Sequence, residues 1–144
     1  MNAAKPAPPP PALQITDADM RELRKVVDRF TDGKLGEAAE ALELELERAQ
    51  VVAQGRIPPD VVTMRSRASF EDLSTGKRRE FELVYPNESD PTEGKVSVLA
   101  PVGLALLGLR VGHTIRWPMP RGRQTTLELL EVSYQPEAAG DFDR

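Results

Sequence analysis

The segment SVLAPVGLALLGLRVG, residues 97–112, is the longest nearly uncharged run of this chain and the best guide to its fold. Arg110 is its only charged residue, and an apolar run that follows neither helical nor strand periodicity is typical of a segment buried on most sides. Pro101 suits the first turn of a helix, and the three glycines mark turns or close packing. We therefore expect a short strand, one or two helical turns and a further turn here, with Leu106 or Leu107 buried against a sheet.

Strand-like patterns lie on both sides of this run. Apolar side chains recur at every second residue over 61–70 and 81–85, and a Ser-Thr-Gly turn separates the two segments. Residues 113–117 and 127–134 read as two further strands around a loop rich in proline and arginine. These patterns predict an antiparallel sheet with one short helix against it.

Two amphipathic helices precede the sheet. Thr16 and Asp17 can cap the first helix, whose apolar stripe ends at residues 32–33, and the second helix continues from Leu35 until Gly55. Helices of about fifteen residues joined by a short loop pack antiparallel and reach about 22 Å. The predicted class is therefore α+β, with a short antiparallel helical hairpin before the sheet.

The acidic surface of the second helix has two interpretations. Five glutamates precede its first basic residue, and they form either a solvated face or a contact surface for a basic partner. Leu44 and Val51 lie off the apolar stripe of this helix, so we expect them to dock it against the sheet domain.

The chain divides into four parts by composition and pattern. Residues 1–14 form a Pro/Ala-rich arm expected to be disordered, and residues 15–56 form the helical hairpin. Residues 60–137 form the sheet domain, and residues 138–144 form a tail. A chain of 144 residues has room for one ordinary domain with a small appendage.

Composition narrows the possible functions. The chain has no cysteine, which removes disulfides, thiolate metal sites and a cysteine nucleophile. No apolar run is long enough for a membrane span or a signal core, so we expect a cytoplasmic protein without membrane contact. A net charge of −4 favours a protein partner over a nucleic-acid phosphate backbone.

The central run also resembles a known family. The pattern Ala-Pro-Val-Gly-x-Ala-Leu-Leu-Gly-x-x-Val-Gly, followed by Ile115, Trp117 and Pro120, is similar to the C-terminal domain of Gre-type transcription elongation factors. Residues 15 to 141, including the segment 134–141, resemble the regulators of nucleoside diphosphate kinase (Rnk). That resemblance implies an FK506-binding-protein-like sheet domain behind an abbreviated hairpin.

The same resemblance implies a partner and a contact site. Gre-type domains contact the rim of the RNA polymerase secondary channel with the loop before the short helix. The corresponding residues here are Leu99, Ala100, Pro101 and Val102, and Ala100 stands where those factors often have serine. We expect a monomer that reaches DNA or the transcription complex only through polymerase. The basic tips at residues 77–79 and 121–123 are solvated, or they meet an acidic polymerase surface.

Transcript cleavage is a competing function implied by the resemblance. Gre-type factors use paired carboxylates at the tip of a long coiled coil to help hold a magnesium ion, a task suited to Asp and Glu. Asp32, Glu37 and Glu40 lie near the tip here, but they lack the family's paired arrangement, and the helices are short. Acids at a helix end also serve as caps and solvated charge.

A prolyl isomerase and an adaptor that binds nucleoside diphosphate kinase directly are also open as functions. Trp117 is the only candidate for the floor of an isomerase pocket, and a barrel-closing role competes with that assignment. His113 is expected to be a turn residue. Our prediction is a noncatalytic regulator, without cofactor or metal, that competes with Gre-type factors and is linked to regulation of the kinase.

Overall fold

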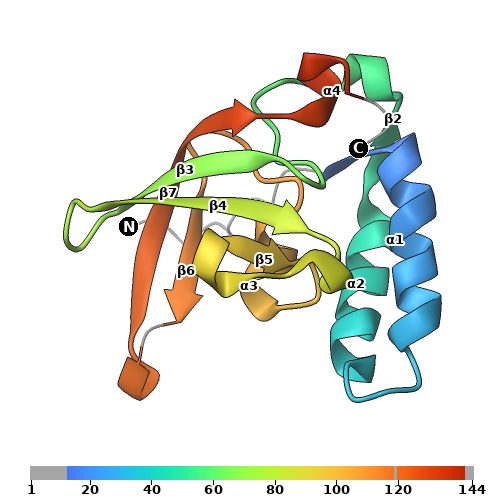
Figure 1. The fold of residues 1–144 in the computed structure, drawn as a ribbon, viewed down its shortest axis with the longest axis horizontal. Helices are drawn as coiled ribbons and strands as arrows, with labels where there is room; N and C mark the ends of the chain where they lie inside the picture. Colours follow the sequence, from blue (N-terminus) through green and yellow to red (C-terminus); the bar gives the residue numbers. More distant parts are fainter. Residues whose placement is uncertain (1–12, 119, 142–144) are drawn as a thin grey trace, which may run out of the picture.

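The computed structural model describes residues 13–118 and 120–141. Two antiparallel helices, α1 (Asp17–Phe30) and α2 (Gly36–Arg48), lie beside a curled sheet (Figure 1). The Thr16 hydroxyl oxygen accepts a hydrogen bond from the Asp19 N–H at 3.0 Å and so caps α1, as predicted. None of the helices in the described ranges is long and apolar enough to cross a membrane.

The second helix ends seven residues before the predicted Gly55, because tertiary pairing replaces its last turn. Residues Gln50–Val52 form strand β2, which pairs in parallel with strand β1 (Gln14–Thr16). The Gln50 N–H donates to the carbonyl oxygen of Leu13 at 2.7 Å, and Leu13 is buried. The part of the predicted arm at residues 13–14 is therefore packed, whereas its residues 1–12 lie outside the described range.

The prediction that Leu44 and Val51 dock the hairpin is wrong. Their side chains are 65% and 50% exposed. Leu42 and Leu46 are buried instead. Leu44 is two positions from each of them, which corresponds to a rotation of about 200° around the helix and places it on the opposite face. Leu44 therefore faces away from the core.

A five-stranded sheet forms the second part of the molecule. Its order is β5-β4-β3-β7-β6, and every neighbouring pair is antiparallel except β4 and β5. The strands are β3 (Arg67–Asp72), β4 (Arg78–Val84), β5 (Lys95–Ser97), β6 (Thr114–Pro118) and β7 (Gln124–Tyr134).

The strand predicted from residue 61 begins only at Arg67. Arg65 has φ of 64°, a left-handed conformation that turns the chain out of an extended path. Residues 61–64 are all buried, so the alternation read from the sequence does not describe an inner and an outer face there. The Arg65 N–H donates to the Leu83 carbonyl oxygen, and this bond holds the turn against β4.

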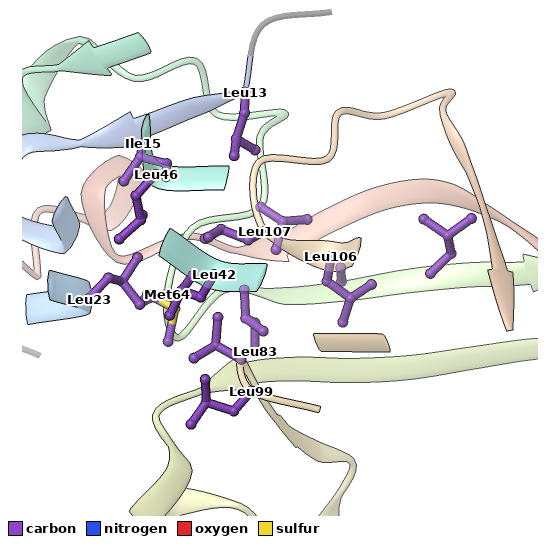
Figure 2. Packing of buried hydrophobic residues seen from close by; sticks show 14 of the residues in the cluster. Leu13, Ile15, Leu23, Leu42, Leu46, Met64, Leu83, Leu99, Leu106 and Leu107 are labelled. Carbon is purple, nitrogen blue, oxygen red and sulfur yellow. The ribbon is translucent and has the colours of Figure 1, made fainter. Parts of the chain in front are cut away.

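The short helix α3 (Pro101–Leu106) packs on the concave side of the sheet. Leu106 and Leu107 are 2% and 3% exposed, which confirms the prediction that this run is core. Figure 2 shows them in one cluster with side chains from both parts of the chain, including Leu23 and Leu42 of the hairpin. The hairpin and the sheet therefore share a hydrophobic core.

The far end of the sheet is closed by an aromatic pair. Phe81 of β4 stacks on Trp117 of β6 with ring centroids 4.4 Å apart and planes 20° apart. Two strands separate β4 from β6 in the sheet, so this contact requires strong curling. Trp117 therefore has the barrel-closing position.

Candidate functional site

The loop between β5 and α3 is a tight, hydrogen-bonded turn. The Ser97 hydroxyl oxygen accepts from the Leu99 N–H at 3.1 Å, and the Ala100 N–H donates to the Ser97 carbonyl oxygen at 3.0 Å. Ala100 has extended angles (φ −69°, ψ 147°) and is the N-cap of α3. The sequence thus places Ala100 and the first residues of α3 at a defined position beside the sheet.

Gly103 allows α3 to begin this close to β5. A Cβ atom at Gly103 would lie 1.8 Å from the carbonyl oxygen of Ser97 and 2.7 Å from its carbon. Both are backbone atoms of the neighbouring strand, so a larger residue would displace the helix or the strand. The geometry of the loop therefore depends on a glycine at this position.

The four residues assigned to the loop by resemblance differ in how much they present to a partner. The Leu99 side chain is 4% exposed and belongs to the core. Ala100 and Val102 are half-buried, and Pro101 is the first residue of α3. A partner that approaches this loop would meet the Ala100 turn and one side of Val102, while Leu99 supports the turn from inside.

The acids at the hairpin tip are dispersed. Asp32, Glu37 and Glu40 are all exposed. Across residues 13–118 and 120–141 no three His, Cys, Asp or Glu side chains come together in a way that could hold a metal ion. His113 precedes β6 and its N–H donates to the Arg110 carbonyl oxygen, as expected for a turn residue.

A cleft of about 400 Å³ lies where the hairpin meets the sheet domain, and sequence reasoning missed it. Asp19 of α1 accepts a hydrogen bond from the Met64 N–H at 3.1 Å. On the other side, the Thr63 hydroxyl donates to Glu137 of helix α4 (Pro136–Ala139) at 2.7 Å. The loop at residues 63–65 is therefore held by an acid from each end of the chain.

Arg65 forms the wall of this cleft. Its guanidinium lies 5.1 Å from the centroid of the Tyr85 ring and donates to both carboxylate oxygens of Glu88, at 2.9 to 3.2 Å. Burial raises the pKa of Asp19 to about 7, partly offset by the Met64 N–H, and burial also raises the pKa of the Tyr85 hydroxyl. Asp19 is paired with the Met64 N–H and Arg65 with Glu88, so the arrangement suits a structural joint between the two parts.

The pattern of the sequence could not reveal this joint. Asp19 and Met64 are 45 residues apart, and Thr63 and Glu137 are 74 residues apart. Asp19 also lies in the first turn of α1, where an acid is ordinarily explained by the positive end of the helix. The local signals are Arg65 and Arg67, since basic residues inside a largely apolar segment need partners, and Arg65 has its partner, Glu88, beside the joint.

The fold and the β5–α3 turn define a Gre-type C-terminal domain carried behind a short helical hairpin. Residues 57–134 match the family model "Transcription elongation factor, GreA/GreB, C-term", and residues 11–52 match the model "Rnk N-terminus". A solved structure, "Prokaryotic transcription elongation factor GreA/GreB from Nitrosomonas europaea", has a TM-score of 0.76 and 39% identity and covers 86% of this chain and 99% of its own.

Curated relatives include both groups. The "Regulator of nucleoside diphosphate kinase" of Escherichia coli (strain K12) is 46% identical over 92% of this chain and 96% of its own length. "Transcription elongation factor GreA" of Solidesulfovibrio magneticus is 32% identical over 78% of this chain and 69% of its own length. The chain belongs to the Rnk family, in which an Rnk N-terminus precedes a GreA/GreB-type C-terminal domain.

Proposed function

We propose that this protein is a noncatalytic regulator of transcription that binds RNA polymerase near its secondary channel and competes there with Gre-type factors. The observation that carries the proposal is the β5–α3 turn, which has a fixed geometry on a domain that matches the GreA/GreB model. The contact would use Ala100 and the exposed side of Val102, with Pro101 at the start of the helix. Membership of the family supports a Gre-related role in transcription.

The length of the hairpin favours occupation of the channel entrance over cleavage. The 14 residues of α1 span about 21 Å at the rise of an α-helix, in agreement with the length expected from the sequence. Asp32 and Glu37 at its tip are solvated and have no third acid beside them among the described residues. A magnesium ion needs several oxygen ligands in a near-octahedral arrangement, which these side chains do not provide on their own.

A stalled elongation complex with a cleavage factor tests this proposal. Added in increasing amounts, this protein should reduce the yield of shortened transcripts until the effect saturates, because two proteins cannot occupy one surface together. Alone, it should shorten none. Cleavage by this protein alone, lost in Asp32→Asn or Glu37→Gln, would instead identify it as a cleavage factor.

The kinase adaptor remains the second candidate, because a relative carries the name "Regulator of nucleoside diphosphate kinase". In our proposal this protein affects the kinase indirectly, through transcription. Direct capture of the purified kinase by this protein, without effect on polymerase, would reverse the order of the two candidates.

An isomerase activity has little structural support. The groove of about 740 Å³ beside α3 is lined by residues that include Leu104, Leu107 and Ile115, with no Phe, Tyr or Trp among the described residues that line it. The Phe81 and Trp117 rings stack on each other and close the end of the sheet. Among the described residues, the cleft beside Arg65 has two aromatic side chains in its lining, Phe30 and Tyr85, fewer than the several that line an isomerase pocket, and the Arg65 guanidinium lies over the Tyr85 ring.

A further inference from the structure

The charge of this protein is distributed unevenly along its length. Residues 94–127 contain no Asp or Glu, although the whole chain has a net charge of −4. The five glutamates of α2 lie in the hairpin at one end of the molecule. The β3–β4 turn and the β6–β7 turn lie away from the hairpin, at the other end (Figure 1). Although the net charge of the whole chain is negative, the end of the molecule opposite the hairpin is therefore basic.

The basic end consists of two turns that are tied together. The Leu73 N–H of the β3–β4 turn donates to the Thr126 carbonyl oxygen of β7 at 3.0 Å. Beside it, Thr125 donates to the Asp72 carboxylate at 2.7 Å, and its hydroxyl lies 3.1 Å from that of Ser74. These contacts hold the β3–β4 turn against the start of β7, which follows the β6–β7 turn.

Four exposed cations lie at these turns, and we call them the basic tip: Lys77 and Arg78 at the junction of the β3–β4 turn with β4, and Arg121 and Arg123 in the β6–β7 turn. Within the described parts of the chain, none of the four forms an ion pair. Asp72 is buried and its carboxylate is occupied by Thr125 and Ser74, so it faces inward. Two half-buried acids lie beside the tip: Glu71 is opposite Arg78 in the β3–β4 ladder, and Glu128 is opposite Glu71 in the β3–β7 ladder.

The chemistry of the tip favours a phosphate backbone over an acidic protein. Protein interfaces have an apolar centre, but among the described residues Leu73 is the only large apolar side chain exposed at this end. Three of the four cations are arginines, which bind phosphates with two parallel hydrogen bonds.

Double-stranded DNA fits the tip better than a single strand does. Single strands depend on stacking of their bases on aromatic rings. The Phe81 and Trp117 rings near this end already stack on each other. Because neither of these rings is free to stack on a base, the tip recognises its ligand by charge. Duplex DNA has a higher density of phosphates than a single strand has.

We propose that the basic tip binds the phosphate backbone of double-stranded DNA, without sequence preference. This contact is direct, whereas the resemblance and the net charge of −4 predict DNA contact only through polymerase. The proposal does not depend on the proposed function, because it can be tested with no polymerase present.

The test is the anisotropy of a fluorescent 20-base-pair duplex titrated with the full chain at 20–150 mM salt. The logarithm of the binding constant should fall linearly with the logarithm of salt concentration, by about 0.9 for each phosphate neutralised. A variant with K77Q, R78Q, R121Q and R123Q should bind at least about 10-fold more weakly at the lowest salt and lose about 2 to 4 units of that slope.

A matched variant separates the tip from net charge. Arg21, Arg24, Arg29 and Lys34 are also exposed and lie on α1 and the loop after it, so R21Q, R24Q, R29Q and K34Q cause the same change in charge. The slope should stay within about 1 unit of the parent in this control. Equal losses in the two variants, or no duplex binding at 20 mM salt, would overturn the proposal. Thermal melting of both variants checks that the fold is intact.

Two competitors distinguish the kind of partner. Unlabelled duplex should displace the probe better than a single strand of the same length does, and better than polyglutamate at equal charge concentration. Displacement by polyglutamate that equals displacement by duplex would assign the tip to an acidic protein. A single strand that competes as well as duplex would overturn the choice of duplex.

Discussion

Asp19, in the first turn of α1, accepts a hydrogen bond from the backbone N–H of Met64 at 3.1 Å. This bond joins the helical hairpin to the sheet domain across a cleft that also contains Arg65 and Glu137. Because the carboxyl is largely removed from water, its pKa is raised to about 7. The joint between the two parts of the molecule is therefore sensitive to pH near neutrality.

Asp19→Asn should change how stability depends on pH. With Asp19 at a pKa of about 7 in the folded state and 3.8 as the reference value, unfolding releases a proton between these pH values. The free energy of unfolding of the parent therefore falls by up to about 1.4 kcal/mol per pH unit over this range and levels off above pH 7. The asparagine side chain keeps an oxygen that can accept the hydrogen bond from the Met64 N–H, but it does not ionise. The free energy of unfolding of the variant should therefore not fall with pH in this way.

Urea denaturation of parent and variant at pH 5 to 8 measures the effect. The difference in free energy of unfolding, variant minus parent, should rise with pH by more than about 1 kcal/mol. Asp72→Asn is the control, since the pKa of Asp72 is lowered to about 2 by bonds from Thr125 and Ser74, and it is ionised in both states over this range. A difference for Asp19→Asn that does not change with pH would contradict the prediction.

Ala100→Asp should weaken polymerase binding without destabilising the domain. Ala100 is the N-cap of α3 and makes no side-chain cap, so an aspartate there can accept from the free amides of the first turn and stabilise the fold by about 1 kcal/mol. The same substitution adds a charge to the proposed contact surface. Capture of core polymerase on immobilised protein should fall at least about 10-fold, which corresponds to about 1.4 kcal/mol.

Ala100→Ser is the matched control for that experiment. Serine also caps a helix but adds no charge, so its polymerase capture should equal or exceed that of the parent. If Ala100→Asp melts at or above the parent temperature and still binds normally, the loop is not the contact surface.

Gly103→Ala should lower the free energy of unfolding by roughly 1 to 3 kcal/mol, because the added methyl group meets the Ser97 carbonyl. Gly55→Ala provides the comparison, since a Cβ atom at Gly55 has nothing within 4 Å, and its effect should stay within about 0.5 kcal/mol. Chemical denaturation of both variants gives the two values. Equal stabilities would mean that α3 can shift away from β5 at little cost.

Leu106→Ala and Leu107→Ala should each cost roughly 2 to 5 kcal/mol, because both leave a cavity in the core shared by the hairpin and the sheet. Leu44→Ala removes the same atoms from an exposed position and should change stability by less than about 0.5 kcal/mol. Differential scanning calorimetry of the three variants provides the measurement. Losses below about 1 kcal/mol at both core positions would contradict their assignment to the core.

Local sequence was enough to predict the elements whose formation depends on near neighbours. The Thr16 cap and the apolar stripe of α1 act within a few residues, and the apolar run around Leu106 has no charge to keep it at the surface. For the same reason the hairpin-then-sheet order and the short helix after Ala100 could be predicted. The proposal that the β5–α3 loop contacts polymerase came from resemblance, because nothing in its local chemistry marks it as a contact.

The way these elements meet depends on contacts between distant parts of the chain. The left-handed turn at Arg65 depends on the hydrogen bond to Leu83 and the ion pair with Glu88, two residues from a later strand and loop. The second helix ends early because the residues after it pair with β1 as strand β2. Leu44 is exposed because Leu42 and Leu46, on the other face of α2, pack into the shared core. Each of these contacts joins residues far apart in the chain, and local periodicity carries no information about such pairs because it records only which side chains favour burial.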